Sequence, residues 1–336
     1  MARQLRVEYE GAVYHVMSRG DRREPIFHDD SDRHGFLSAL TEICGRTGWR
    51  VHAYVLMDNH YHWLLETPQA NLVRGMQWFQ STYTIRFNRR HRLVGHLFQG
   101  RYKAVLIDPE SPEYFATVAD YIHLNPARAR MVGGGRPLVA YPWSSLPLYG
   151  WPVGRRPPWL AVERLLGTLG WQDRVSHRRA FLRRLEERAM AGMSPGELKL
   201  LKRGWCIGDA DFRGLLLDRI QGLREGKPEL SPVSVAATDS DHAEMEAARL
   251  IARGLEALGL GRETLTQLPK SDPRKRLLGS LVRRRTVMSL RWIGRELAMG
   301  AESRVSRLCG KATDRDFEMK LQALERQIIR MSRSKD

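Results

Sequence analysis

The stretch from residue 49 to residue 67 contains two runs of strand-forming residues joined by a tight turn. WRVHAYVLM and YHWLLET are rich in β-branched and aromatic residues. The dipeptide Asp58-Asn59 between them is typical of a hairpin turn. Because a hairpin holds two strands side by side and antiparallel, any fold of this chain must contain that pair.

Further strands and helices are predicted on both sides of this hairpin. The pattern indicates a strand at 12–19, a helix at about 30–47, a helix at about 71–90, strand-like residues at 96–108 and a helix from there to about Asn125. The order is β-α-β-β-α-β-α. It predicts a ferredoxin-like α+β fold, an antiparallel sheet with helices, followed by one further helix.

The composition changes beyond residue 130. Glycine, proline and arginine are concentrated in residues 133–137 and 151–159, so a first domain is predicted to span residues 1–150. Residues 151–242 are interpreted as a helical extension that ends in a linker poor in large apolar residues. Residues 243–336 are predicted to be an all-α, basic region.

The chain is strongly basic, with 55 Lys+Arg against 38 Asp+Glu and a formal net charge of +17. This charge favours a polyanionic partner, nucleic acid first and an anionic membrane surface second. No apolar run approaches the roughly 20 residues that a membrane span needs, and the first residues are polar, so a cytoplasmic protein is expected. Cys44, Cys206 and Cys309 form no CxxC pair and are predicted to be reduced and structural.

Two histidines interrupt the second strand of the hairpin. Alternate side chains of a strand share a face, so His60 and His62 are expected to point the same way, with Tyr61 on the opposite face. Two imidazoles at this spacing can bind one metal ion. An HxH sequence alone, however, is most often two polar residues on a half-solvated strand.

The segment DYIHLNP adds a second group of polar residues. Tyr121 and Asn125 are one helical turn apart, and Pro126 is expected to end their helix. By itself, Tyr121 is more simply a core residue with its hydroxyl at the rim. If the helix packs on the histidine-bearing face, Tyr121 lies beside the metal and Asn125 supplies an amide oxygen as a third ligand.

Two basic residues and three further histidines lie near these motifs in the sequence. Arg101 and Lys103 are two residues apart in a strand-like segment, so they are expected either to bind phosphate from one face or to form an ordinary solvated face. His15, His52 and His123 are predicted to be structural.

Three ordered motifs, MDNHYHWLLE, FQGRYKAVLI and VADYIHLNPARARMV, resemble those of the single-tyrosine HUH transposases of small bacterial insertion sequences, and most of all the REP-associated tyrosine transposases. The resemblance covers about residues 5–150. It implies that His60 and His62 are the HUH pair, that Tyr121 is the nucleophile and that Asn125 is the polar metal ligand.

The activity that this resemblance implies is the cleavage and rejoining of single-stranded DNA near hairpins or palindromic repeats. A divalent ion, Mg²⁺ or Mn²⁺, would polarise the phosphate, and the tyrosine would form a 5′-phosphotyrosine intermediate. The family also implies a possible homodimer. Two alternatives stay open: a domesticated, non-cleaving DNA-binding regulator, and a replication-initiator-type HUH nuclease.

Residues 270–336 contain 18 Lys+Arg and 8 Asp+Glu, and so hold much of the positive charge. Within them, residues 286–310 are predicted to form a helix-turn-helix that resembles the DNA-binding domain of bacterial replication initiators. The second helix would present Ser303, Arg304, Ser306 and Arg307 to a major groove. The alternative is a plain helical hairpin with a basic surface.

Overall fold

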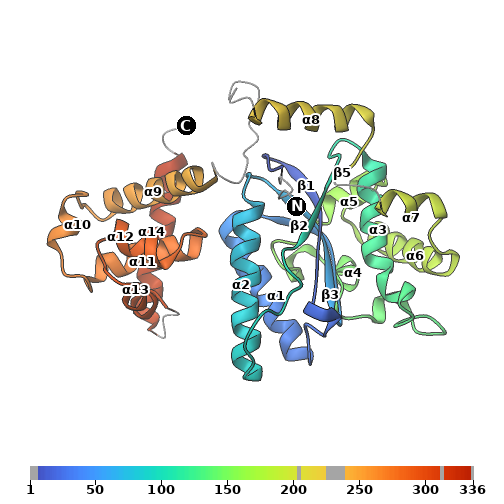
Figure 1. The fold of residues 1–336 in the computed structure, drawn as a ribbon, viewed down its shortest axis with the longest axis horizontal. Coiled ribbons are helices and arrows are strands. Elements are labelled where there is room, and N and C mark those ends of the chain that lie inside the picture. The colour runs from blue at the N-terminus through green and yellow to red at the C-terminus, as the bar shows by residue number, and fades with distance from the viewer. Residues whose placement is uncertain (1–6, 203–205, 225–238, 311–313, 334–336) are drawn as a thin grey trace. The chain divides into compact units, whose positions relative to one another are not determined.

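The computed structural model describes residues 7–202, 206–224, 239–310 and 314–333. The chain divides into two compact units, of which the first comprises residues 1–44 and 48–235 and the second residues 45–47 and 236–336. Figure 1 shows strands only in the first unit. The linker predicted before residue 243 falls largely on 225–238, which lie outside the described residues.

The first unit is built on a sheet with the strand order β2-β3-β1-β4-β5. Strands β1 (Ala12–Arg19), β2 (Arg50–Met57), β3 (His60–Thr67) and β4 (Lys103–Ile107) pair antiparallel throughout. The hairpin predicted around Asp58-Asn59 is the β2–β3 pair. The first four strands have the order of a ferredoxin-like sheet, which confirms the predicted fold class.

Strand β5 (Cys206–Ile207) was not predicted. It pairs parallel to β4, with Cys206 opposite Leu106 and Ile207 opposite Ile107. Residues 151–242 were expected to form only helices and a linker, and a two-residue strand has no periodicity to reveal it. Strand β4 is also shorter than the strand-like segment that suggested it.

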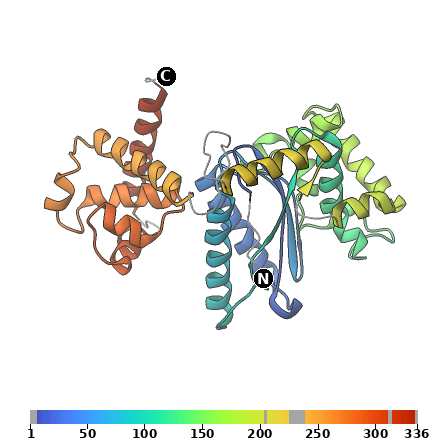
Figure 2. The same cartoon turned by 45° about the horizontal axis from the view of Figure 1, so that its top comes forward.

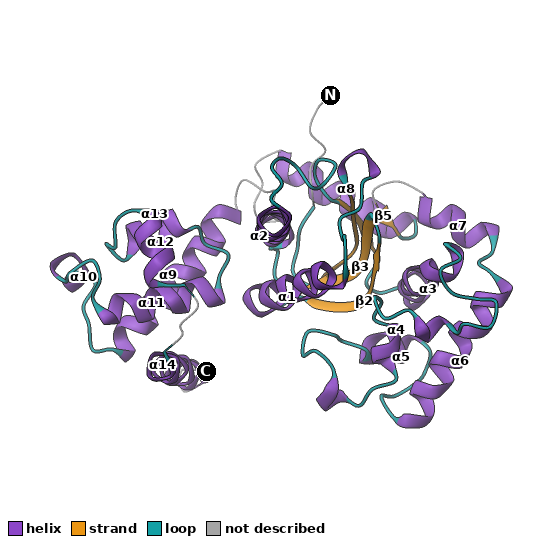
Figure 3. Cartoon of the chain, turned by 90° about the horizontal axis from the view of Figure 1, so that it is seen from below, coloured by secondary structure: helices purple, strands orange, loops and turns teal. Residues whose placement is uncertain are grey.

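Helices cover both faces of the sheet (Figure 3). Helices α1 (Asp30–Thr47) and α2 (Leu72–His91) lie on one face, where Phe36 and Phe79 have ring centroids 5.0 and 6.2 Å from that of Tyr61. Helix α3 (Pro112–Arg128) lies on the other face and packs against β2 and β3. Tyr61 therefore faces away from α3, as its position in the strand predicted.

The ends of these helices follow the sequence closely. Asp29 caps α1 by accepting a hydrogen bond from the Asp32 backbone N–H. Ser111 caps α3 in the same way. The helix predicted at about 71–90 is α2, whose large buried side chains form one stripe: Leu72, Met76, Phe79, Tyr83 and Phe87.

The residues that follow α3 form further helices, and two α-helices among them pack against α3. These two are α5 (Glu163–Thr168) and α6 (Val175–Ala191). The remaining elements of this unit are the helices α4 (Leu146–Tyr149), α7 (Pro195–Lys202) and α8 (Ala210–Arg224) and the 3-10 helices η1 (Asp21–Arg23), η2 (Leu138–Ala140) and η3 (Val153–Arg155).

The second unit consists of helices in its described part (Figure 2). They are α9 (Asp239–Ala257), α10 (Thr264–Gln267), α11 (Pro273–Arg285), α12 (Leu290–Glu296), α13 (Glu302–Leu308) and α14 (Arg315–Arg333). Their apolar side chains form a separate core around Ile251, Leu278 and Ile293. None of the helices within the described ranges combines the length and apolar character that crossing a bilayer requires.

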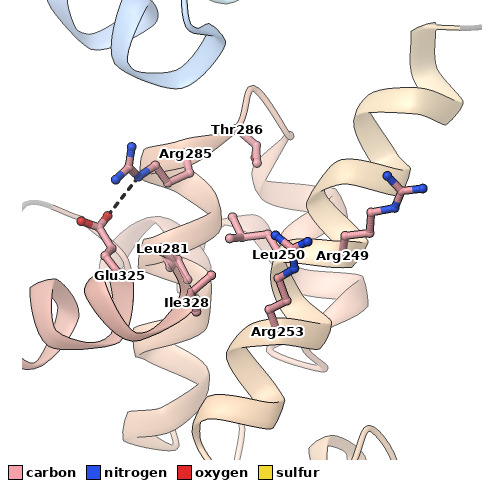
Figure 4. A pocket seen from close by; sticks show the side chains of 8 residues that line it. All are labelled: Arg249, Leu250, Arg253, Leu281, Arg285, Thr286, Glu325 and Ile328. Atoms are coloured by element: carbon pink, nitrogen blue, oxygen red, sulfur yellow. Dashed lines mark ion pairs between the residues drawn. The ribbon is translucent and has the colours of Figure 1, made fainter. Parts of the chain in front are cut away.

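A hollow of about 430 Å³ lies among helices α9, α11 and α14 of the second unit (Figure 4). Three arginines line it, and one of them, Arg285, forms an ion pair with Glu325 at 3.4 Å. The complete lining is Arg249, Leu250, Arg253, Leu281, Arg285, Thr286, Glu325 and Ile328.

The contact between α2 and Trp49 gives a test of the packing. A methyl group at Gly75 would lie 2.1 Å from Trp49 Cζ2, and Trp49 is fixed because its Nε1–H donates to Asn71 Oδ1 at 2.6 Å. We expect Gly75→Ala to destabilise the first unit by about 1–3 kcal/mol. Gly35→Ala in α1 meets no atom within 4 Å and is expected to be neutral or to stabilise by up to about 1 kcal/mol. The urea denaturation midpoints of the two variants measure these effects. Equal shifts of the midpoint in Gly75→Ala and Gly35→Ala would contradict this packing.

Candidate active site

The first strand residue after the hairpin turn is His60, and the alternation of β3 places His60 and His62 on the face that carries α3. Their ring centroids are 5.1 Å apart. The ring of Tyr121, on α3, lies 5.6 Å from that of His62 and nearly perpendicular to it. The structure thus brings together the two histidines and the tyrosine that the sequence analysis selected, although 59 positions separate His62 from Tyr121.

Neighbouring side chains orient both imidazoles. His60 Nδ1 donates to Asn59 Oδ1 at 2.8 Å, which leaves its Nε2 with a free lone pair. His62 Nδ1 shares a hydrogen bond of 2.9 Å with His15 Nε2. When His62 is the donor in that bond, its Nε2 is also free for a metal ion. Such outer partners are the usual means of fixing the tautomer of a metal-binding histidine.

Burial keeps both rings neutral. Desolvation, with the positive charge of Arg19 nearby, lowers the pKa of His60 to about 4. Desolvation, followed by the neighbouring His15 and His60, holds the pKa of His62 well below its ordinary value. Because only an unprotonated imidazole binds a metal ion, the pair is ready to act as ligands at neutral pH.

Asn125 lies one turn after Tyr121 on α3 and is buried. Its Nδ2–H donates to the Tyr121 carbonyl at 2.8 Å, so the amide oxygen is the end left for another partner. The prediction that Pro126 ends the helix was wrong, because α3 continues to Arg128. A proline in the last turn costs one helical hydrogen bond, and that turn keeps others, including Ala129 N–H to Asn125 O.

Two residues beside Tyr121 were not predicted as part of the site. The Arg128 guanidinium lies 4.7 Å from the centroid of the Tyr121 ring, and the His15 ring lies 5.8 Å from it. The spacing contained the signal for Arg128, since seven residues are about two helical turns. His15 was predicted to be structural; its place on the sheet face became evident only from the β1–β3 register, in which Met17 pairs with His62.

Side chains on two sides of helix α3 hold it in place, one facing α6 and one facing the sheet. The buried Asp120 carboxylate forms ion pairs with Arg184 at 2.6 Å and Arg188 at 3.0 Å, both on α6. On the sheet side, His123 Nε2 lies 2.8 Å from Ser145 Oγ, and Ser145 Oγ–H donates to the β2 carbonyl of Tyr54. Because Asp120 and His123 lie close to Tyr121 on α3, their contacts fix the position of Tyr121.

The predicted basic pair is divided by the start of a strand. Lys103 is the first residue of β4 and pairs with Met17, which places it on the histidine-bearing face. Arg101 precedes β4, so the expectation that the two share a strand face was wrong. Both side chains are exposed. Tyr102 between them is buried.

Helices α12 and α13 in the second unit are joined by residues 297–301, where Ala298 and Gly300 have positive φ angles of 49° and 85°. The buried Lys275 ammonium donates to Ala298 O at 3.1 Å and so fixes this turn to α11. On α13, Ser303 and Arg307 are exposed. Arg304 is half-buried and donates to Met299 O at 3.4 Å, which ties it to the turn.

Part of the chain is similar to known transposases. Residues 8–125 match the family model described as "Transposase IS200 like". A solved structure, "Structure of the REP associates tyrosine transposase bound to a REP hairpin", is similar with 16% sequence identity and a TM-score of 0.37, and the match covers 48% of this chain and 90% of that chain. No curated protein matches the chain. The family match confirms the predicted resemblance: residues 8–125, which carry His60, His62, Tyr121 and Asn125, are similar to IS200-like transposases.

Proposed function

We propose that this protein is a metal-dependent transposase that cleaves and rejoins single-stranded DNA near hairpins, with Tyr121 as the nucleophile. The Tyr121 oxygen bonds to the phosphorus as the bond from phosphorus to the 3′ oxygen breaks. The products are a 5′-phosphotyrosine and a free 3′-OH. A second 3′-OH reverses the step and rejoins the strand, so no nucleotide cofactor is needed.

The observation that carries this proposal is the convergence of His60, His62 and Tyr121 from a strand and a helix onto one side of the sheet. A structural core explains a half-buried tyrosine, but not two neutral imidazoles whose Nδ1 atoms are held by Asn59 and His15. The same arrangement favours an enzyme, because a non-cleaving regulator needs no tyrosine beside two metal-binding histidines. It does not by itself distinguish a transposase from a replication-initiator nuclease; the family match favours the transposase.

The residues present fit a divalent ion. His60 Nε2, His62 Nε2 and the Asn125 amide oxygen supply two nitrogens and one oxygen, a set that accepts Mg²⁺ or Mn²⁺ and leaves positions for phosphate and water. Such an ion, when bound, withdraws charge from the phosphate oxygens and favours phenolate. Arg128 and Lys103, both exposed near this face, supply positive charge for the DNA backbone.

We further propose that α12 and α13 add affinity for duplex DNA, as a helix-turn-helix with α13 in the major groove. Arg307 and Ser303 are the exposed α13 residues suited to DNA contact. Arg304 supports the turn, because its guanidinium bonds to Met299 O. We treat a homodimer as a possibility raised by the family alone.

The nucleophile is tested by Tyr121→Phe. This change keeps the ring and removes only the attacking oxygen, so DNA binding should persist while the covalent adduct vanishes. The measurement is a denaturing gel with Mn²⁺ and a hairpin-bearing oligonucleotide labelled at its 3′ end. Tyr114→Phe, seven residues earlier on α3, is the matched control and should retain the adduct. Strand cleavage that persists in Tyr121→Phe would overturn the assignment.

The outer hydrogen bond is tested by His15→Phe and His15→Gln. Phe keeps the ring but removes the acceptor for His62 Nδ1–H, whereas Gln restores an acceptor. We expect His15→Phe to weaken Mn²⁺ binding by about 10–100-fold and to lower cleavage accordingly, with partial recovery in His15→Gln. Electron paramagnetic resonance of free Mn²⁺ measures the affinity. Equal affinities in the three proteins would show that His15 only fills space.

The duplex contact is tested by Arg307→Ala on α13. Losing one phosphate contact should reduce duplex affinity and lower the slope of log K against log salt by about 1. Arg330→Ala on α14 removes the same charge from another exposed arginine and serves as the control. Fluorescence anisotropy at several salt concentrations measures both. Identical slopes for the two variants would contradict the proposed role of α13.

A further inference from the structure

A second group of metal-binding side chains lies where α1 begins and α2 ends. His28 precedes α1, Asp32 is in its first turn, and His91 is the last residue of α2. One ligand atom of each lies within 4.8 Å of those of the other two. The group belongs to the helices on the sheet face opposite α3, so it is separate from the Tyr121 site.

The three side chains are held in place by their surroundings. The Asp32 carboxylate is 3% exposed and accepts from the His28 backbone N–H at 2.8 Å. His91 Nε2 lies 2.9 Å from both oxygens of that carboxylate. The Phe87 ring lies 4.9 Å from the His28 ring and 4.6 Å from the His91 ring, so one aromatic side chain orients both imidazoles.

A simple ion pair accounts for only part of this group. The hydrogen bond between His91 Nε2 and the Asp32 carboxylate explains their contact. It does not account for the His28 ring, which lies 4.4 Å from the His91 ring. Two imidazole nitrogens and one carboxylate oxygen are instead a common ligand set for Zn²⁺ and similar ions.

The neighbouring charges allow a cation here. Arg90 Nη1 bonds to Asp32 Oδ1 at 2.5 Å and lies 3.2 Å from His91 Nε2, but its guanidinium is also paired with Asp29 at 2.6 Å. The Asp29 carboxylate therefore offsets much of the positive charge of Arg90. The other oxygen of Asp32, Oδ2, faces His28, whose backbone N–H bonds to it. His28 is exposed and borders a hollow of about 350 Å³, which gives an ion and its water ligands access.

We propose that His28, Asp32 and His91 bind a divalent transition-metal ion such as Zn²⁺, with water completing the coordination. The ion joins the segment before α1 to the C-terminal end of α2. It thereby stabilises the arginine-rich end of α2, residues 86–92. This role is structural and is independent of the proposed cleavage of DNA.

The test is the number of Zn²⁺ equivalents bound by the full chain, measured by isothermal titration calorimetry. His28→Ala is the main variant, because His28 is exposed and its loss should not prevent folding. We expect it to lose one equivalent, or to bind that equivalent at least 10-fold more weakly, and to lose the rise in Tm that Zn²⁺ gives the parent. His34→Ala removes another exposed histidine of α1 and should behave like the parent.

A chain with His60→Ala and His62→Ala separates this site from the cleavage site. It should keep the equivalent that His28→Ala loses, and Co²⁺ bound there should give visible absorption of a four- or five-coordinate ion. The proposal is overturned if the parent binds no Zn²⁺, if His28→Ala binds as many equivalents as the parent, or if the double variant loses the equivalent instead.

Discussion

The pairing of β3 with β1 is the constraint on which the candidate site depends. Its register places Met17 opposite His62 and Arg19 opposite His60, so His15, two residues before Met17, reaches the His62 ring on the same face. A shift of one residue would turn the histidines toward α1 and α2. The large aromatic side chain of Tyr61 on the opposite face opposes that shift, because it fills the core between those helices.

The second requirement is that α3 stays fixed over this face. Asp120 ties it to α6, and His123 ties it through Ser145 to β2. The sheet therefore supplies the imidazoles and the helical extension holds the tyrosine. This explains why residues beyond the family match, such as Arg184, contribute to a site that lies within it. Burial keeps His60 and His62 neutral, and their outer partners direct the free nitrogens.

Much of the fold was predictable because local signals agreed with it. The hairpin, the α2 stripe through Met76 and Phe79, and the four-strand order all follow from periodicity and turn residues. Strand β5 did not, since two residues carry no pattern. His60, His62, Tyr121 and Asn125 were selected as site residues from short motifs and their resemblance to a family. His15 and Arg128 were missed because their roles depend on strand register and on a helix that passes through Pro126.

The central claim is that His60 and His62 hold an ion that Tyr121 needs for DNA cleavage. The most direct measurement compares cleavage of a hairpin-bearing oligonucleotide by the parent and by His62→Ala, each first treated with EDTA and then supplied with Mn²⁺. The account predicts that Mn²⁺ restores cleavage to the parent only, while both proteins bind the oligonucleotide equally. Full cleavage in EDTA, or by His62→Ala, would contradict it.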